Sequence, residues 1–334
     1  MAKEKHLGLV ATDKDDAIHV LDSPEWWEWW YFDADFDNGY NMIGTFHFGS
    51  PRAPANPDVR FIEIALYDPA GNKKLVRKRY PKEQCTAAED HLDVSMGPNT
   101  YKGNLKKTHL HFEADGQGCD ITYEALVEPY LPEENLTEPV GWLNPHARAK
   151  VSGTLTWDGK TMEVKGEGYH DHNWGSIVLG SKGTPEDTLW TRIFVNDWVV
   201  NIYGGLNLRR DGHGPQGKAL IYHKDKLVVV TKKVGGIASD PVIKEGSITY
   251  PGTFKMVCND PGVLEGEVTF KTKQVLEFMD LLARFKPFQK WYTELAVGHP
   301  AYFRFRLEYD INLTVHGEKI KDKGTCWCEY HKFV

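Results

Sequence analysis

Hydrophobic and polar residues alternate in short runs along almost the whole chain. Residues 25–35 predict a strand, Asn38 and Gly39 predict a two-residue turn, and residues 40–48 predict the partner strand of a hairpin. Similar alternating or aromatic runs, separated by turn-forming residues, continue to the end of the sequence. Many short strands in this order predict an all-β fold made of β-barrels or sandwiches.

One late segment has a helical pattern instead. Apolar residues recur at helical spacing within residues 273–292, which predicts a single α-helix that ends or kinks at Pro287. Residues 180–185 are rich in glycine and proline and indicate a domain boundary near the middle of the chain. We therefore predict an N-terminal domain of residues 1–180 and a C-terminal domain of residues 181–334 that carries the helix.

The composition describes a globular protein without a nucleic-acid partner. Of the 334 residues, 41% are hydrophobic and 26% are charged, which are ordinary values for folded domains. The formal net charge of −7 argues against a basic nucleic-acid-binding surface. No apolar run is long enough to span a membrane, and the charged residues 1–6 precede no hydrophobic segment. We expect no transmembrane segment, no secretory signal and a cytoplasmic location.

Aromatic residues are unusually frequent, at 12% of the chain. They suit both a β-rich core and a pocket for a hydrophobic ligand, because each ring carries a large apolar area. The five cysteines are widely spaced and match no disulfide or zinc pattern, and we expect the pair Cys326 and Cys328, on one face of a strand, to be small buried residues. Nucleotide-binding and serine-hydrolase fingerprints are also missing from the sequence, which argues against those classes of enzyme.

The densest group of candidate functional residues is the glycine-flanked segment 166–175. On a strand, His170, His172 and Trp174 share one face, and the other face carries Tyr169, Asp171 and Asn173. Three interpretations stay open: a metal site, buried hydrogen bonding, and acid–base or substrate-orienting chemistry. The metal site has no evident third ligand, since position 176 is a serine, and we predict no metal.

A second anomaly is the aromatic run at residues 25–33. Glu28 and Trp30 share one face of the expected strand, and Trp29 and Tyr31 share the other. The run is either a strand packed between two layers or an aromatic wall around an apolar or transiently cationic substrate.

A third candidate is Asp197. Alternation would place it on one strand face with the aliphatic residues Ile193, Val195 and Val199. Burial there would favour the protonated carboxyl, which is the state that a general acid needs. The alternatives are a structural network with a basic partner and a turn that follows a short strand.

Three segments carry a resemblance to a known family: residues 28–32, residues 149–155 and residues 168–175. With these the chain resembles the hydroxyneurosporene synthase (carotenoid 1,2-hydratase)/AttH-like family, which also includes kievitone hydratase and fungal Diels–Alderases. The resemblance implies two lipocalin-like β domains side by side, with a ligand cavity in or between them. It also implies a hydrophobic substrate and no cofactor.

The resemblance further implies how a hydratase of this family would act. It would protonate an alkene and let water capture the cation, using a His-x-Trp pair and a later Tyr-x-Asp. The first pair is present as His172 and Trp174, whereas Asp197 follows Val195 where the family has tyrosine. We expect Asp197 to be the acid and His172 to orient the acid or the water.

These arguments lead to a defined set of site residues. The predicted catalytic residues are Asp197, His172, Tyr169 and Asp171. The predicted substrate-binding residues are Trp30, Tyr31, Glu28, His170, Trp174, Trp198 and His47. The expected function is a hydratase or cation-type cyclase acting on an isoprenoid or polyene, and a pericyclase and a carrier of a hydrophobic ligand are the alternatives. A homodimer and contact with a membrane surface stay open.

Overall fold

The structure is a computed structural model. The chain folds into two compact units. Unit 1 comprises Met1–Ser181 with Lys224–Lys226, and unit 2 comprises Lys182–His223 with Leu227–Val334. The residues that the structure describes are 7–49, 59–137, 139–176, 187–207, 217–245, 248–283, 285–297 and 299–332. The predicted boundary at residues 180–185 lies outside these ranges.

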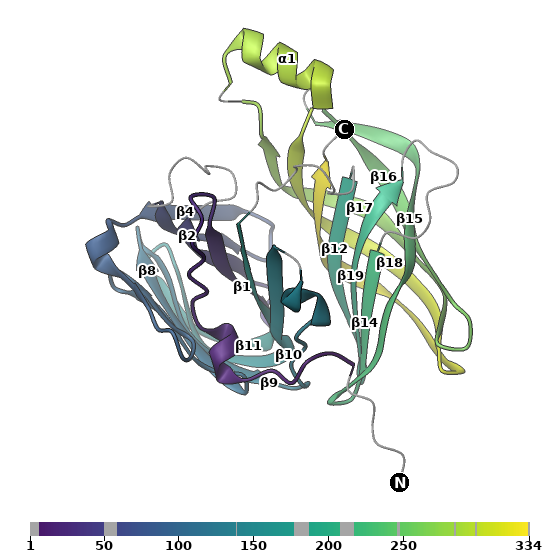
Figure 1. Ribbon diagram of the computed structural model, residues 1–334, viewed down its shortest axis with the longest axis horizontal. Coiled ribbons are helices and arrows are strands. Elements are labelled where there is room, and N and C mark those ends of the chain that lie inside the picture. Colours follow the sequence, from purple (N-terminus) through teal and green to yellow (C-terminus); the bar gives the residue numbers. More distant parts are fainter. Residues whose placement is uncertain are drawn as a thin grey trace. The chain divides into compact units, whose positions relative to one another are not determined.

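Unit 1 is one curled antiparallel sheet of eleven strands (Figure 1). Across the sheet the strand order is β4-β3-β2-β1-β11-β10-β9-β8-β7-β6-β5. The strands are β1 (Trp27–Phe36), β2 (Asn41–Gly49), β3 (Arg60–Tyr67), β4 (Lys73–Arg79), β5 (Cys85–Ala87), β6 (Asp93–Met96), β7 (Asn99–Asn104), β8 (Lys107–Ala114), β9 (Gln117–Ala125), β10 (Val140–Trp157) and β11 (Lys160–Gly175). Three short 3-10 helices accompany them: η1 (Asp13–Asp16), η2 (Lys82–Gln84) and η3 (Glu133–Leu136).

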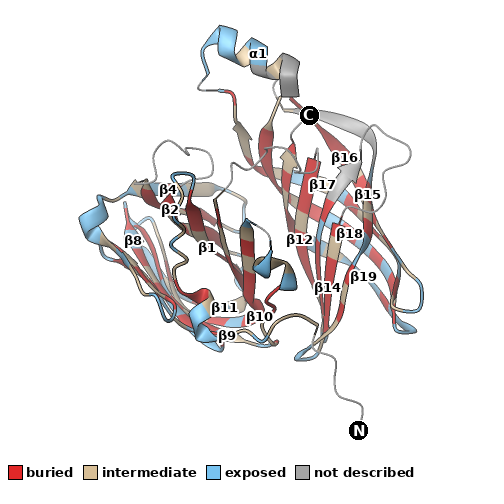
Figure 2. Ribbon diagram, in the orientation of Figure 1, coloured by how far each residue is buried: buried red, intermediate tan, exposed pale blue. Residues whose placement is uncertain are grey.

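The two faces of this sheet differ in composition. Alternate residues of strands from β1 to β11 converge in one apolar cluster, which includes Trp30, Phe32, Tyr101, Tyr123 and Val151. The remaining residues point to the opposite face, and along β8 they are mostly exposed (Figure 2). We call the face that carries the apolar cluster the inner face, and its opposite the outer face.

Unit 2 is a closed barrel of eight strands, in which each strand lies beside the strands that precede and follow it in the sequence. Its strands are β12 (Asp187–Val195), β13 (Trp198–Asn207), β14 (Gly217–His223), β15 (Lys226–Glu245), β16 (Ile248–Asp260), β17 (Leu264–Asp280), β18 (Ala301–Val315) and β19 (Glu318–Lys332). Pairing of β12 with β19 closes the barrel. Inward-facing side chains such as Phe254, Phe270 and Phe305 fill a continuous core.

The predicted helix at residues 273–292 is largely wrong. Residues 273–280 belong to the strand β17, and the helix α1 runs Pro287–Val297. Two bulges, after Thr272 and after Val275, interrupt the pairing of β17 with β18 and shift the alternation of its side chains. The apolar residues of this strand are therefore spaced as they would be in a helix. Pro287 begins the helix rather than ending it, since proline suits a first helical turn.

The fold class is confirmed: the described residues form an all-β protein with one late α-helix. The two units differ in closure, since unit 2 is a barrel and the sheet of unit 1 stays open. Cys326 and Cys328 are buried, as predicted, and so are Cys119 and Cys258, whereas Cys85 is partly exposed. None of the described helices is long and apolar enough to cross a bilayer.

Candidate functional site

Strands β1 and β11 bring the two anomalous sequence segments together. They pair antiparallel from Trp27 opposite Gly175 to Phe36 opposite Gly166. Because side chains alternate along both strands, the pair presents two different sets of functional groups, one on each face of the sheet. Both sets belong to unit 1.

On the inner face lies a buried ionic cluster of Asp16, Glu28, His170 and His172, which we call the inner cluster. All four side chains are fully buried. His172 donates from Nε2 to Oε1 of Glu28 at 2.7 Å, and its Nδ1 lies 3.2 Å from Oδ1 of Asp16. His170 donates from Nδ1 to the carbonyl of Tyr31 at 2.7 Å, and its Nε2 lies 3.2 Å from Oδ2 of Asp16.

In the inner cluster the acidic and basic side chains stabilise one another in their charged forms. Burial alone would lower the pKa of His172, but the nearby carboxylate of Asp16 and the hydrogen-bonded carboxylate of Glu28 outweigh it and raise the pKa to about 9. Burial opposes ionisation of both carboxyls as well, yet His170 and His172 hold the pKa of Asp16 well below its usual range. His172 and His19 similarly lower the pKa of Glu28. Both acids are therefore carboxylates at neutral pH, and neither is a stored proton donor.

A bulged stretch of β10 adds a further buried histidine. Irregular pairing on both sides of His146 breaks the alternation there, and its ring lies 5.6 Å from that of His170. Burial lowers the pKa of His146 to about 3, and the neighbouring His170 adds to this effect. The inner face thus holds one histidine that favours the charged state and one that favours the neutral state.

An N-terminal segment covers the inner cluster. It supplies Asp16 from the end of η1, and the indole N–H of Trp30 donates to the backbone carbonyl of Asp16 at 3.0 Å. His19 follows, and its backbone N–H donates to both carboxylate oxygens of Glu28 at 2.8 and 3.0 Å. The ring of His19 stacks on Trp174 with 3.7 Å between centroids. Its side chain is 25% exposed, so the inner cluster reaches solvent at this point.

Trp174 can lie at this position because Gly141 stands opposite it on β10. A Cβ atom at Gly141 would overlap the indole ring of Trp174. The sequence therefore needs a glycine here for close approach rather than for a turn.

On the outer face lies a hydrogen-bonded network with Asp171 at its centre. Oδ2 of Asp171 accepts from the hydroxyl of Tyr169 at 2.8 Å and from the indole N–H of Trp142 at 3.2 Å. Its Oδ1 accepts from the side-chain amide of Asn173 at 2.7 Å. The Asn144 amide in turn donates to the Tyr169 hydroxyl at 3.2 Å. We call these residues, with Tyr31 and Asp33, the outer network.

The outer network is surrounded by partly exposed aromatic rings. Trp29, His47 and Trp142 are all half-buried, and Trp29 contacts Trp27 and His47. The Tyr31 hydroxyl donates to Asp33 at 3.1 Å. Aromatic rings around a few fixed polar groups are typical of sites that bind hydrophobic small molecules.

The prediction for Asp197 is wrong in its premise. Asp197 and Asn196 form the exposed two-residue turn between β12 and β13, and Asn196 has a positive φ of 50°. The aliphatic pattern ends with the strand at Val195, so alternation could not be extended across the turn. Trp198 begins the next strand and stacks on His223 with 4.0 Å between centroids. Both predicted residues belong to unit 2.

Metal-ligand atoms converge on the inner face. His19, Glu28 and His172 each offer one such atom, and these atoms all lie within 4.8 Å of one another. The sequence argument looked for a third ligand at position 176 and found only a serine. The structure instead supplies further ligand groups from β1 and from the N-terminal segment.

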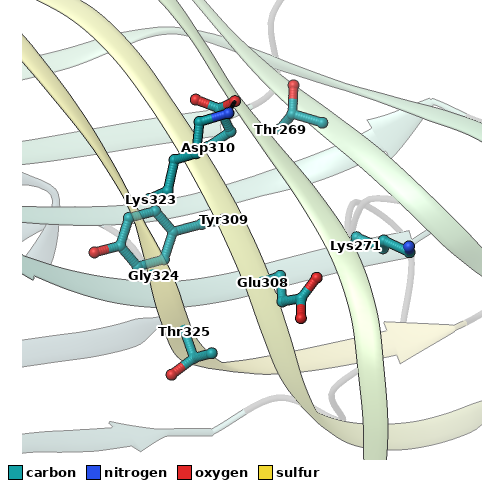
Figure 3. Close-up of a pocket in the computed structure, with 8 residues that line it drawn as sticks. All are labelled: Thr269, Lys271, Glu308, Tyr309, Asp310, Lys323, Gly324 and Thr325. Carbon is teal, nitrogen blue, oxygen red and sulfur yellow. Dashed lines mark ion pairs between the residues drawn. The ribbon is translucent and has the colours of Figure 1, made fainter.

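A surface hollow of about 490 Å³ lies on strands β17, β18 and β19 of the barrel. Figure 3 shows its lining, in which lysines and acids alternate with threonines: Thr269, Lys271, Glu308, Tyr309, Asp310, Lys323, Gly324 and Thr325. Lys323 pairs with Asp310 at 2.7 Å, so the charges largely satisfy one another. Such a lining does not suit a hydrophobic ligand.

Nine of the eleven predicted site residues lie on the two faces of unit 1. Glu28, Trp30, His170, His172 and Trp174 belong to the inner face, and Tyr31, His47, Tyr169 and Asp171 belong to the outer face. Sequence reasoning missed Asp16, His19, Trp142 and Asn144. These residues lie outside the two anomalous segments, and only the acidic run at residues 13–16 gave a local signal.

Comparisons with known proteins place this geometry in context. No protein-family model matches the sequence. A ceramide-binding protein, SVF1 of Yarrowia lipolytica, is 24% identical over 288 residues, which are 72% of this chain and 67% of that protein.

Solved structures match over nearly the whole chain. CghA with Sch210972 has a TM-score of 0.65 at 17% identity and covers 93% of this chain and 89% of its own. A putative AttH from Nitrosomonas europaea has a TM-score of 0.65 at 15% identity, with 100% and 99% covered. Kievitone hydratase from Nectria haematococca has a TM-score of 0.59 at 15% identity, with 97% and 95% covered.

The chain has the fold of the AttH-like, lipocalin-like proteins. The predicted resemblance is thereby confirmed at the level of the fold. At these identities the likeness concerns architecture, and fold alone does not determine a reaction.

Proposed function

We propose that the protein binds a hydrophobic small molecule that carries a polar group, on the outer face of strands β1, β10 and β11. The half-buried rings of Trp29, His47 and Trp142 would contact the apolar part. The outer network around Asp171 would orient the polar group. Where the ligand is a substrate, this site would act by orientation and hydrogen bonding, as a pericyclase does.

The observation that carries the proposal is the position of Asp171. Its carboxylate accepts hydrogen bonds from three different side chains, and although Asp171 itself is buried, the half-buried Trp142 and Asn173 connect it to the more exposed part of this face. A polar group fixed by several partners keeps its direction, which is what a site needs to orient a ligand. Within the outer network Trp142 and Asn173 are half-buried, whereas all four residues of the inner cluster are fully buried.

The similar proteins support a hydrophobic ligand. One is named for binding ceramide, and another is named as a hydratase of kievitone. Enzymatic activity is plausible for a chain with such neighbours. The carotenoid, isoprenoid and terpenoid character of the expected substrate has no support beyond the resemblance in sequence.

Proton-initiated hydration or cyclisation is the second candidate, and the structure of kievitone hydratase is the observation that favours it. Such chemistry needs a protonated acid that faces the alkene. Asp197 lies in an exposed turn, and both acids of the inner cluster are ionised. His172 is protonated, but it is fully buried, and its ring nitrogens face Glu28 and Asp16 rather than a ligand. Orientation without alkene protonation therefore fits the described residues better.

Incubation in D2O with a panel of ceramides, prenylated phenols and acyclic polyenes, followed by mass spectrometry, tests the proposal. We expect ligands to bind without gaining deuterium at an alkene carbon. Asp171→Asn should weaken binding about tenfold or more, while Asp120→Asn, a matched change at an exposed pair with His109 and His111, should not. Deuterium gain that Asp197→Asn abolishes would overturn the proposal in favour of hydration. Equal binding by Asp171→Asn and the wild type would overturn the assigned site.

A further inference from the structure

We propose that His19, Glu28 and His172 form a binding site for one divalent transition-metal ion of the Zn²⁺ class on the inner face of unit 1. The site is separate from the outer network, so the inference stands independently of the proposed function. It joins residues from three segments that are distant in sequence: the N-terminal segment, β1 and β11.

The ligand atoms already have a suitable spacing. Nδ1 of His19 and Nε2 of His172 lie 3.2 Å and 2.7 Å from the same carboxylate oxygen, Oε1 of Glu28. Ligand atoms about 2.0–2.2 Å from a tetrahedral zinc ion lie roughly 3.3 Å apart. Two of the three distances are therefore close to those of a tetrahedral site, and the third, between the two imidazole nitrogens, stays within 4.8 Å. Two imidazoles and one carboxylate are a donor set that zinc sites use.

Asp16 occupies the position of a supporting carboxylate. Its Oδ1 lies 3.2 Å from Nδ1 of His172, the ring nitrogen that faces away from Glu28. In metal sites a ligating histidine usually donates its other ring N–H to a carboxylate, which fixes its orientation. Among the described residues these two atoms make no aligned hydrogen bond, although both are buried. The backbone N–H of His19 holds both oxygens of Glu28 in place.

The charge of the site also calls for a cation. Asp16 and Glu28 bring two carboxylates into a region of zero exposure, and the ion pairs found for them among the described residues are all with histidines. Buried carboxylates are costly unless they are paired or coordinate a metal. A divalent ion would take the place of the His172 proton, because a metal-ligating imidazole is neutral, and it would then balance both charges. The partly exposed ring of His19 provides the route by which the ion could enter, and a fourth position is left for water.

The ion would also fasten the N-terminal segment to the sheet, because His19 and Asp16 both come from that segment. Binding to the folded protein alone raises its stability with metal concentration. Loading with Zn²⁺ should therefore raise the melting temperature of the full chain and protect residues 13–19 from proteolysis.

The test uses the full chain after treatment with a chelator. Titration with Zn²⁺ should show one tightly bound ion per chain, and Co²⁺ should give the visible absorption bands of a tetrahedral site. His19→Ala removes one ligand at a partly exposed position without altering the buried residues, and it should weaken Zn²⁺ binding at least tenfold. Glu28→Gln, which keeps the side-chain volume, should do the same.

A matched control is available on β8. His111 also faces a carboxylate, Asp120, at 2.9 Å, but on the exposed face of the sheet. His111→Ala should bind Zn²⁺ as the wild type does. The inference is overturned when the wild type binds no ion, when His19→Ala binds as tightly as the wild type, or when His111→Ala removes the binding. These outcomes leave ligand binding at the outer network untouched, so failure of one proposal is distinguishable from failure of the other.

Discussion

The two faces of the β1–β11 pair carry different chemistry on the same ten-residue register. The inner face places charged groups against one another with no exposure, whereas the outer face places neutral donors around one carboxylate among half-buried rings. Buried charges are tolerated in a fold only when oppositely charged partners are present beside them. The outer network contains two half-buried residues, Trp142 and Asn173, and removing its neutral donors costs less than removing one partner of a buried charge pair. Adjacent residues in one short segment can therefore serve stability and recognition separately.

The largest expected change in stability follows the loss of the Asp16 carboxylate from the inner cluster. Asp16→Asn leaves both His170 and His172 without their shared acidic partner, and breaking a buried pair typically costs about 3–5 kcal/mol of the free energy of unfolding. Urea denaturation of the metal-free protein should show a loss of this size. A loss below about 1 kcal/mol would mean that the inner cluster is not held by these charges.

The next effect is the dependence of stability on acid. The pKa of His146 is about 3 in the folded chain and about 6.5 when unfolded, so below pH 6.5 only the unfolded state takes up this proton. The free energy of unfolding should therefore fall as pH drops from about 6.5 towards 3, by up to about 1.4 kcal/mol per pH unit. Denaturation curves between about pH 6 and pH 5 measure this slope, because nearer neutral pH the raised pKa of His172 changes stability in the opposite direction.

The variant His146→Gln serves as the control for this slope. It lacks the titrating ring, so its stability should change much less over the same pH range. An unchanged slope in the variant would assign the acid sensitivity to other groups.

A smaller effect on stability is expected on the outer face. Asp171→Asn replaces one acceptor oxygen by an amide, so at least one of the donors Tyr169, Trp142 and Asn173 loses its partner, at a cost of about 1–2 kcal/mol. Stability should thus fall less than in Asp16→Asn, while ligand affinity falls more. Parallel denaturation and binding measurements on both variants test this reversal. If one variant lost more than the other in both stability and ligand affinity, the two faces could not be assigned separate roles.

The smallest effect is expected at Asp197. The residue is exposed in a hairpin turn, so Asp197→Asn should change the free energy of unfolding by less than about 0.5 kcal/mol. Ligand binding should also stay at the wild-type level. A marked loss of either property would restore Asp197 as a functional residue.

The sequence predicted the strands and the main site segments because both depend on local alternation. It placed His170, His172 and Trp174 on one face and Tyr169 and Asp171 on the other, and the pairing of β11 with β1 confirms this division. It could not predict the partners of these residues. Asp16 and His19 lie far from β11 in the sequence and contact it only in the folded chain, so no alternating pattern in the sequence indicates this contact.

The errors arose where alternation was extended past its physical limits. At Asp197 the strand had already ended in a turn, and in residues 273–280 two bulges gave strand residues a helical spacing. The aromatic run at residues 25–33 left two interpretations open; the packed strand is what the structure shows, and the aromatic wall around a substrate stays a proposal. Its inner residues pack against the core, while Trp29 stays half-buried on the outer face.

Photoaffinity labelling with a diazirine-bearing ceramide, followed by peptide mapping, tests the central claim most directly, because it reports where a hydrophobic ligand lies. We predict that the label is found on outer-face residues of β1, β2 and β10, namely Trp29, Tyr31, His47 and Trp142, and that Asp171→Asn reduces it. Labelling confined to strands of unit 2, unaffected by Asp171→Asn, would contradict the account.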